Sequence, residues 1–113
     1  RRIERANRLL ENYYRGAAAE ARAKTELMRE GSRIVAEQLH VRTQHGKRVI
    51  DFVIERGGRW VAIEVKAGNA VRSLAQVLKD TAIANQGGTI VSRGAMYGQR
   101  IMVETIVRQY PNM

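Results

Sequence analysis

The chain has 113 residues, of which 44% are hydrophobic and 27% charged, and these values fit one domain with its own core and exclude a disordered chain. It contains no cysteine, so disulfides, thiolate zinc sites and cysteine nucleophiles are excluded. The net charge of +9 at pH 7 favours a polyanionic partner, although anionic membranes and acidic proteins would also attract such a domain.

The sequence shows neither a membrane-spanning segment nor a secretory signal peptide. No apolar run approaches the roughly 20 residues that a membrane helix needs. Because the chain begins with Arg1 instead of methionine, we interpret residues 1–113 as a single domain from a longer protein. Residues 1–15 then form either part of this domain or a linker or accessory helix.

The first third of the chain is predicted to be helical. After Gly16 the sequence is rich in strong helix formers until Gly31-Ser32, a pair that is typical of a helix end. We expect either two helices or one helix with a kink at Gly16. Apolar residues before the glycine already show helical spacing, namely Ile3, Ala6, Leu10 and Tyr13.

Three strands are predicted next. Residues 39–43 alternate as in a strand, whereas residues 33–38 could equally extend the helix. "RVIDFVIE" (48–55) and "WVAIEVKA" (60–67) are stronger strands, and Gly57-Gly58 joins them in a hairpin turn.

A second helix should open at Gly68-Asn69, with Asn69 as its N-cap and with a buried stripe formed by Val71, Leu74, Leu78 and Ala82. A short buried strand, "TIVS" (89–92), follows the glycine pair that ends this helix, and residues 101–110 fit a strand or a helix. The predicted fold is a mixed α/β (α+β) domain with the order helix, three antiparallel strands, helix, strand.

The hairpin carries charged residues among its hydrophobic ones. A turn centred between the two glycines would place Asp51 directly opposite Glu64, with Lys66 one pleat further on the same face. Opposed carboxylates repel each other, and a divalent cation between them removes that repulsion. A solvated charged cluster is the alternative, but the other residues predicted on this face are not polar, namely Val49, Val53, Trp60 and Ala62. We therefore expect a metal site that binds Mg²⁺, with Mn²⁺ or Zn²⁺ as alternatives.

A third acid, Glu20, interrupts a stripe of small and apolar residues on the first helical segment. Its carboxylate would either join the site on the hairpin or pair with Lys24 one turn later.

A helix glutamate, a strand aspartate and Glu-x-Lys on the next strand resemble the PD-(D/E)xK nuclease superfamily, over about residues 16–92. The resemblance implies a metal-dependent endonuclease in which Asp51 and Glu64 bind the metal and Glu20 assists there. It also implies that Lys66 orients or activates the attacking water and that Gln76, in "LAQVLKD", corresponds to a glutamine that many members carry. The proline of the superfamily's name is absent from this chain.

The stretch "EVKAGNAVRSLAQVLKD" (64–80) is also similar to the C-terminal toxin domains of bacterial polymorphic toxins, including contact-dependent growth inhibition effectors. This similarity implies secretion within a large effector, cleavage of tRNA or DNA in the cytoplasm of a target bacterium, and an acidic immunity protein as partner. The alternatives are a DNA repair or junction-resolvase-type nuclease and a nucleic-acid-binding module without catalysis.

The loop "SRGAMYGQR" (92–100) is a candidate nucleic-acid-binding segment. Arg93 and Arg100 would contact phosphates, and Tyr97 could stack on an unpaired base. A solvated connecting loop explains the same residues equally well.

Overall fold

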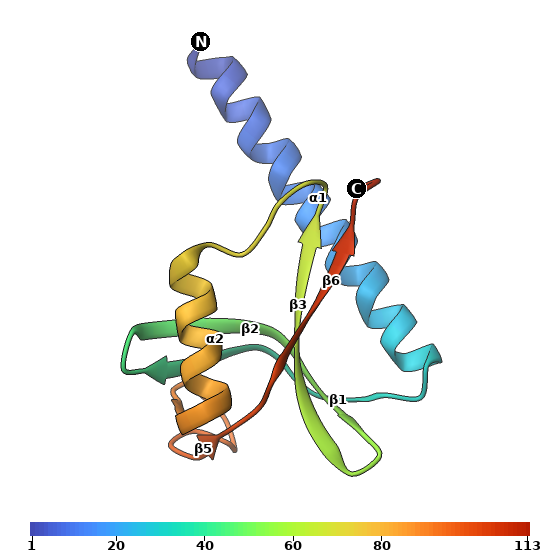
Figure 1. The fold of residues 1–113 in the computed structure, drawn as a ribbon. Helices are drawn as coiled ribbons and strands as arrows, with labels where there is room; N and C mark the ends of the chain where they lie inside the picture. The colour runs from blue at the N-terminus through green and yellow to red at the C-terminus, as the bar shows by residue number, and fades with distance from the viewer.

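Two helices lie on opposite faces of a six-stranded mixed sheet in the computed structural model, which describes residues 1–113 (Figure 1). The elements in chain order are α1 (Arg2–Arg29), β1 (Arg33–Thr43), β2 (Gly46–Arg56), β3 (Arg59–Ala67), α2 (Leu74–Gln86), β4 (Gly88–Ile90), β5 (Arg100–Ile101) and β6 (Thr105–Tyr110). The mixed α/β class and the predicted order of the first six elements are confirmed.

The strands follow the order β5-β4-β1-β2-β3-β6 across the sheet. All neighbours are antiparallel except β3 and β6, which run parallel and are joined through α2, β4 and β5. Residues 101–110, for which the sequence allowed a strand or a helix, contain the end of β5 and all of β6.

Each face of the sheet has its own hydrophobic core. The face that α2 covers contains Leu39, Val41, Ile50, Val53, Ala62, Ile83, Ile90, Ile101 and Val103. The face that α1 covers contains Ala19, Ala23, Leu27, Phe52, Ile54, Ile63, Val65 and Tyr110. Alternating residues of β3 thus support different helices, as expected for a strand that is buried on both sides.

Helix α1 is continuous, with no break at Gly16, and only its second half packs on the sheet. Residues 1–15 are all exposed, and this part of the helix projects beyond the rest of the molecule (Figure 1). The other end of α1 is fixed by Glu30, whose carboxylate accepts hydrogen bonds from Arg108 and Arg56. These bonds, those from Arg108 foremost, lower the pKa of Glu30 to about 2.

Helix α2 begins later than predicted. Its N-cap is Ser73 rather than Asn69, because the Ser73 hydroxyl accepts from the Gln76 amide while the Gln76 side chain accepts from the Ser73 amide. This reciprocal pair satisfies two backbone donors of the first turn and fixes the start of the helix.

The predicted buried stripe of α2 is confirmed at Ala82 and wrong at Val71, Leu74 and Leu78. Val71 and Leu74 are 78% and 75% exposed, whereas the buried side chains of the helix are Asp80, Ala82 and Ile83. Asp80 points into the domain because it binds Arg48 and Arg72 there, and part of the apolar face of α2 is exposed as a result. Neither helix of the chain is long and apolar enough to cross a membrane.

Two glycines allow a test of the packing. A methyl group at Gly88 would overlap Val41 Cγ1 and stand 2.9 Å from the Arg42 carbonyl oxygen, whereas one at Gly16 would meet nothing within 4 Å. We expect Gly88→Ala to lower the free energy of unfolding by about 2 kcal/mol and Gly16→Ala to raise it by about 1 kcal/mol. Urea denaturation measures both, and equal effects of the two changes would contradict the packing described.

Candidate functional site

The site forms where β2 and β3 separate. Their ladder runs from Arg56–Arg59 to Phe52–Ile63, in the predicted register, and no backbone pair continues it at Asp51. The Val65 amide instead donates to the Asp51 carboxylate, Oδ2, at 2.8 Å. Asp51 and Glu64 are therefore not ladder partners, and the side chain of Asp51 takes the place of a backbone acceptor.

The predicted shared face of β2 is also wrong. Ile50 and Val53 both belong to the core beneath α2, while Phe52 belongs to the core beneath α1. Strict alternation would place Ile50 and Phe52 on the same face of the sheet, so the alternation is broken around Asp51. Val49 and Val53, which lie on either side of this break, therefore cannot share a face. The alternation of side chains between the two faces of β2 is thus interrupted at Asp51, a candidate metal ligand.

Glu64 is held in a buried chain of charges. It is 6% exposed, and its Oε2 accepts from Arg48 Nη2 at 2.6 Å. Arg48 Nε donates in turn to Asp80 Oδ1 at 2.7 Å, and Arg72 donates to the other Asp80 oxygen at 3.0 Å. The sequence analysis missed Arg48 and Asp80. The only available signals were an arginine beside apolar strand residues and an acid on an apolar helix.

The pKa of Glu64 is raised above its ordinary value. Burial is the main cause and the neighbouring Asp51 carboxylate is the second, while Arg48 and Lys66 act in the opposite direction. The other oxygen of Glu64, Oε1, forms an ion pair with Lys66 Nζ at 3.5 Å. Both Asp51 and Lys66, which the sequence pattern grouped with Glu64, thus affect the pKa of Glu64.

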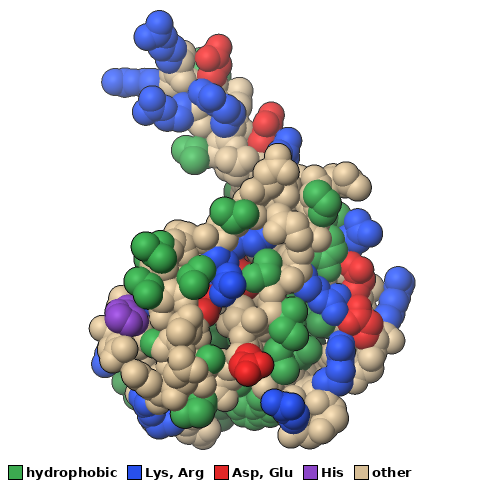
Figure 2. All heavy atoms as spheres, viewed as in Figure 1, with side chains coloured by type: hydrophobic (Ala, Val, Ile, Leu, Met, Phe, Trp, Pro, Cys, Tyr) green, Lys and Arg blue, Asp and Glu red, His purple; other side chains and the backbone are tan.

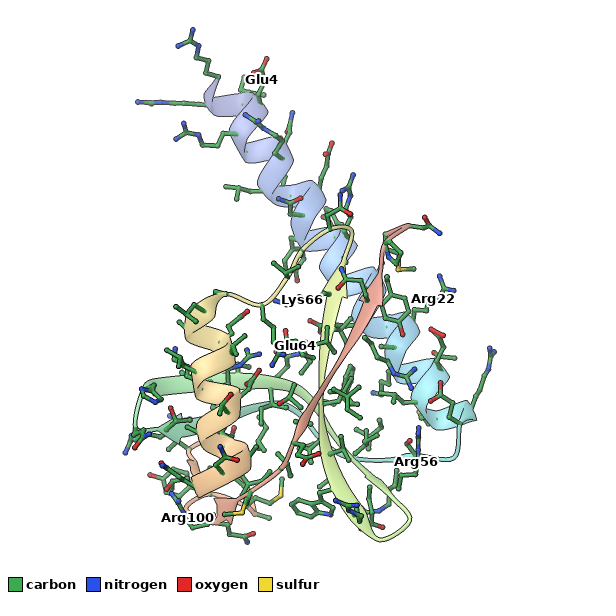
Figure 3. The ribbon with its side chains drawn as sticks, in the orientation of Figure 1. Glu4, Arg22, Arg56, Glu64, Lys66 and Arg100 are labelled. Carbon is green, nitrogen blue, oxygen red and sulfur yellow. The ribbon has the colours of Figure 1, made fainter.

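Lys66 and Gln76 meet at the start of α2. Lys66 Nζ donates to Gln76 Oε1 at 3.3 Å, so this glutamine faces the site instead of solvent. Figure 3 shows Glu64 and Lys66 on the side of β3 that faces α2. The capping box of α2 thus also orients an oxygen toward the lysine.

Glu20 joins the cluster through Gln38, a residue that the sequence analysis did not single out. Gln38 Nε2 donates to Glu20 Oε2 at 3.2 Å and makes a longer contact of 3.4 Å with Asp51 Oδ1. Burial, then Asp51 and Glu37, raise the pKa of Glu20. The alternative pairing of Glu20 with Lys24 is wrong, because Lys24 binds Glu37 at 2.8 Å.

Gln38 has an unusual backbone. Its φ of +49° lies in the left-handed region, and it is the only non-glycine residue of the chain with a positive φ. A side chain in this conformation costs roughly 1–2 kcal/mol and such residues gather at functional sites. The strain coincides with the contact that connects α1 to Asp51.

Two hollows border the cluster, on either side of Gly16. One of about 400 Å³ is lined by Asn12, Arg15 and Lys66 among others, and the second, of about 420 Å³, by Tyr13, Glu20 and Gln38 among others. Asp51 and Glu64 line neither hollow. Lys66, which contacts Glu64, lines the first hollow, and Gln38, which contacts Asp51, lines the second.

The donor set fits a hard divalent cation bound by two carboxylates. No group of three or more His, Cys, Asp or Glu side chains lies close enough to hold a metal, so Glu20 is not placed as a third ligand. Asp51 Oδ1 and Glu64 Oε1 are the candidate ligand atoms, because their contacts are the longer ones, 3.4 Å to Gln38 and 3.5 Å to Lys66. Mg²⁺ and Mn²⁺ suit two such oxygens, while Zn²⁺ favours nitrogen and sulfur donors.

The basic loop that the sequence suggested for nucleic-acid binding contacts none of these residues. Arg100 donates to the Gln86 carbonyl oxygen at 2.9 Å and to Thr89 Oγ1 at 3.0 Å, and it lies below α2, far from Lys66 (Figure 3). Arg93 and Tyr97 are exposed on the same loop. Binding by this loop stays a prediction, separate from the carboxylate cluster.

The strain at Gln38 predicts the order of stability of two variants. Gln38→Gly and Gln38→Ala both remove the amide contacts with Glu20 and Asp51, but only glycine adopts a positive φ at no steric cost. We expect the glycine variant to be more stable than the alanine variant by about 1 kcal/mol in urea denaturation. A more stable alanine variant would mean that the residue is not left-handed in solution.

The charge of Asp51 predicts the titration of Glu64. Asp51→Asn removes a negative neighbour that disfavours the ionised form of Glu64, so the pKa of Glu64 should fall. The measurement is a ¹³C NMR titration of the glutamate carboxyl carbons, with Glu55→Gln as a control that should leave this pKa unchanged. An unchanged pKa in Asp51→Asn would show that the two carboxylates do not interact.

Residues 15–110 match a family described as "Domain of unknown function (DUF4143)". Comparison with curated proteins and with solved structures gives no match. The matched range includes the second half of α1, the whole sheet and every residue of the cluster around Asp51 and Glu64. The chain therefore belongs to the DUF4143 family.

Proposed function

We propose that this domain hydrolyses phosphodiester bonds of nucleic acid with a divalent cation, Mg²⁺ foremost, bound by Asp51 and Glu64. The observation that carries the proposal is the burial of two mutually repelling carboxylates beside Lys66, at 9% and 6% exposure, where the β2–β3 ladder stops. Cation binding would remove the repulsion that their burial side by side creates.

The residues of the cluster would have different roles in the reaction. A bound divalent cation would lower the pKa of its water and neutralise phosphate oxygens. Asp51 and Glu64 orient one carboxylate oxygen each, because Val65 and Arg48 occupy the other oxygens. Lys66, partly exposed at the first hollow, would place its positive charge against a phosphate and stabilise the charge that develops on it. Gln76 holds the lysine by accepting from Nζ.

A second candidate is a nucleic-acid-binding module without catalysis. It is favoured by the contact of Arg48 with Glu64, because an internal cation already neutralises this carboxylate. In that case the chain from Glu64 to Asp80 is a buried ion-pair network with a structural role. The two candidates differ in whether metal-dependent cleavage occurs.

The biological setting stays a prediction. Two settings would use the same site. One is a toxin domain that is delivered into a target bacterium and bound by an acidic immunity protein, and the other is a repair or junction-resolvase-type enzyme. They differ in genomic context, because a toxin requires a neighbouring immunity gene. The choice between tRNA and DNA is likewise a matter for experiment.

A cleavage assay tests the proposal. Purified domain is incubated with total tRNA and with plasmid DNA, with Mg²⁺, Mn²⁺ or Zn²⁺ and with EDTA. We expect metal-dependent cleavage that falls at least about 100-fold in Asp51→Asn, which removes the charge of a metal ligand, and in Lys66→Met, which removes the charge placed against the phosphate.

Matched controls make the assay specific. Glu55→Gln removes a carboxylate at the other end of the hairpin, and Lys47→Met removes an exposed lysine in β2, so both should cleave like the wild type. Binding of nucleic acid without cleavage under any metal would favour the second candidate. Cleavage that persists in both site variants would contradict the assignment of the site.

A further inference from the structure

The projecting half of α1 presents a basic stripe. Arg5, Arg8, Asn12 and Arg15 recur at intervals of three and four residues, so they lie along one side of the helix. These residues are exposed, and none of the three arginines forms an ion pair within the domain. Figure 2 shows Lys and Arg side chains gathered at the end of this helix, away from the body.

The stripe is continuous with the candidate site. Asn12 and Arg15 at its inner end line the hollow of about 400 Å³ that Lys66 also lines. The stripe from Arg5 to Arg15 is about 15 Å long at 1.5 Å per residue. This length matches about four successive phosphates at 3.4 Å per nucleotide of one strand.

We propose that the first half of α1 is an arm that binds the phosphate backbone of nucleic acid and leads it toward the hollow beside Lys66. Unpaired arginines on a rigid helix complement a polyanion, and their affinity for it depends on counterion release. The direction toward Lys66 rests on the proposed function, whereas binding by the arm does not. The arm, rather than the loop at 92–100, supplies the basic surface next to the carboxylates.

The opposite side of the arm is apolar, with Ile3, Leu10 and Tyr13 exposed, and this makes an anionic membrane the competing partner. Nucleic acid is favoured because the basic side, and not the apolar one, carries Arg15 into the hollow with Lys66. A membrane would instead be contacted through the apolar side.

The test measures binding in EDTA, so that cleavage plays no part. A fluorescent duplex and a single strand of about 20 nucleotides each are titrated with Asp51→Asn protein, with and without Arg5→Ala/Arg8→Ala. We expect the double change to weaken binding roughly tenfold at about 0.1 M salt. For the duplex it should make the negative slope of log K against log salt shallower by about 2, because each phosphate contact contributes about −0.9.

A charge-matched control separates the arm from overall charge. Arg42→Ala/Lys47→Ala removes two exposed cations from the β1–β2 hairpin and should change the salt slope less than the arm variant does. Circular dichroism should show an unchanged fold for the arm variant, since alanine is a stronger helix former than arginine. Equal effects of the two double variants would overturn the proposal.

Failure of the arm and failure of the proposed function give different results. If wild-type protein cleaves nothing while Arg5→Ala/Arg8→Ala still loses binding, the nuclease proposal fails and the arm stands. If the wild type cleaves and the arm variant keeps the wild-type affinity and salt slope, the arm fails. Loss of binding to phosphatidylserine vesicles without loss of nucleic-acid binding would assign the arm to a membrane and overturn the proposal.

Discussion

The Val65 amide donates its hydrogen bond to the Asp51 side chain instead of to a neighbouring strand, and the arrangement of the site depends on this contact. A buried amide needs an acceptor, and one side-chain oxygen supplies it at the point where β2 leaves β3. The same bond fixes the Asp51 carboxylate within the sheet, close enough to raise the pKa of both Glu64 and Glu20. Asp51 thus completes the hydrogen bonding of the sheet and also shifts the titration of two neighbouring acids.

The buried charges beneath α2 are paired with one another. Arg48 lies between Glu64 and Asp80, and Arg72 binds the second oxygen of Asp80. Removing one member of such a buried network leaves an uncompensated charge and destabilises by about 3–5 kcal/mol. The network also explains why α2 is oriented with Asp80 inward, since Asp80 is the α2 residue that binds the guanidinium groups of Arg48 and Arg72.

Local patterns predicted the hairpin well and the partners of its charges poorly. Alternating apolar residues and Gly57-Gly58 determine the β2–β3 register, because these signals lie close together in the chain. The split at Asp51 and the strain at Gln38 could not be predicted, because both arise from contacts between different elements. The stripe of α2 failed for a related reason. Periodicity ranks residues by hydrophobicity, and it takes no account of the arginines in other segments that bind Asp80.

The continuity of α1 has a mechanical consequence. Residues 2–29 form a single helix, fixed at its inner end by the Leu27 core and by Glu30. A load on the N-terminal half would bend this helix, and Gly16 is the residue of lowest helix propensity in its middle. Glu20 lies one turn beyond that point and is tied through Gln38 to Asp51. A bend of the helix at Gly16 would therefore act first on the contact between Glu20 and Gln38.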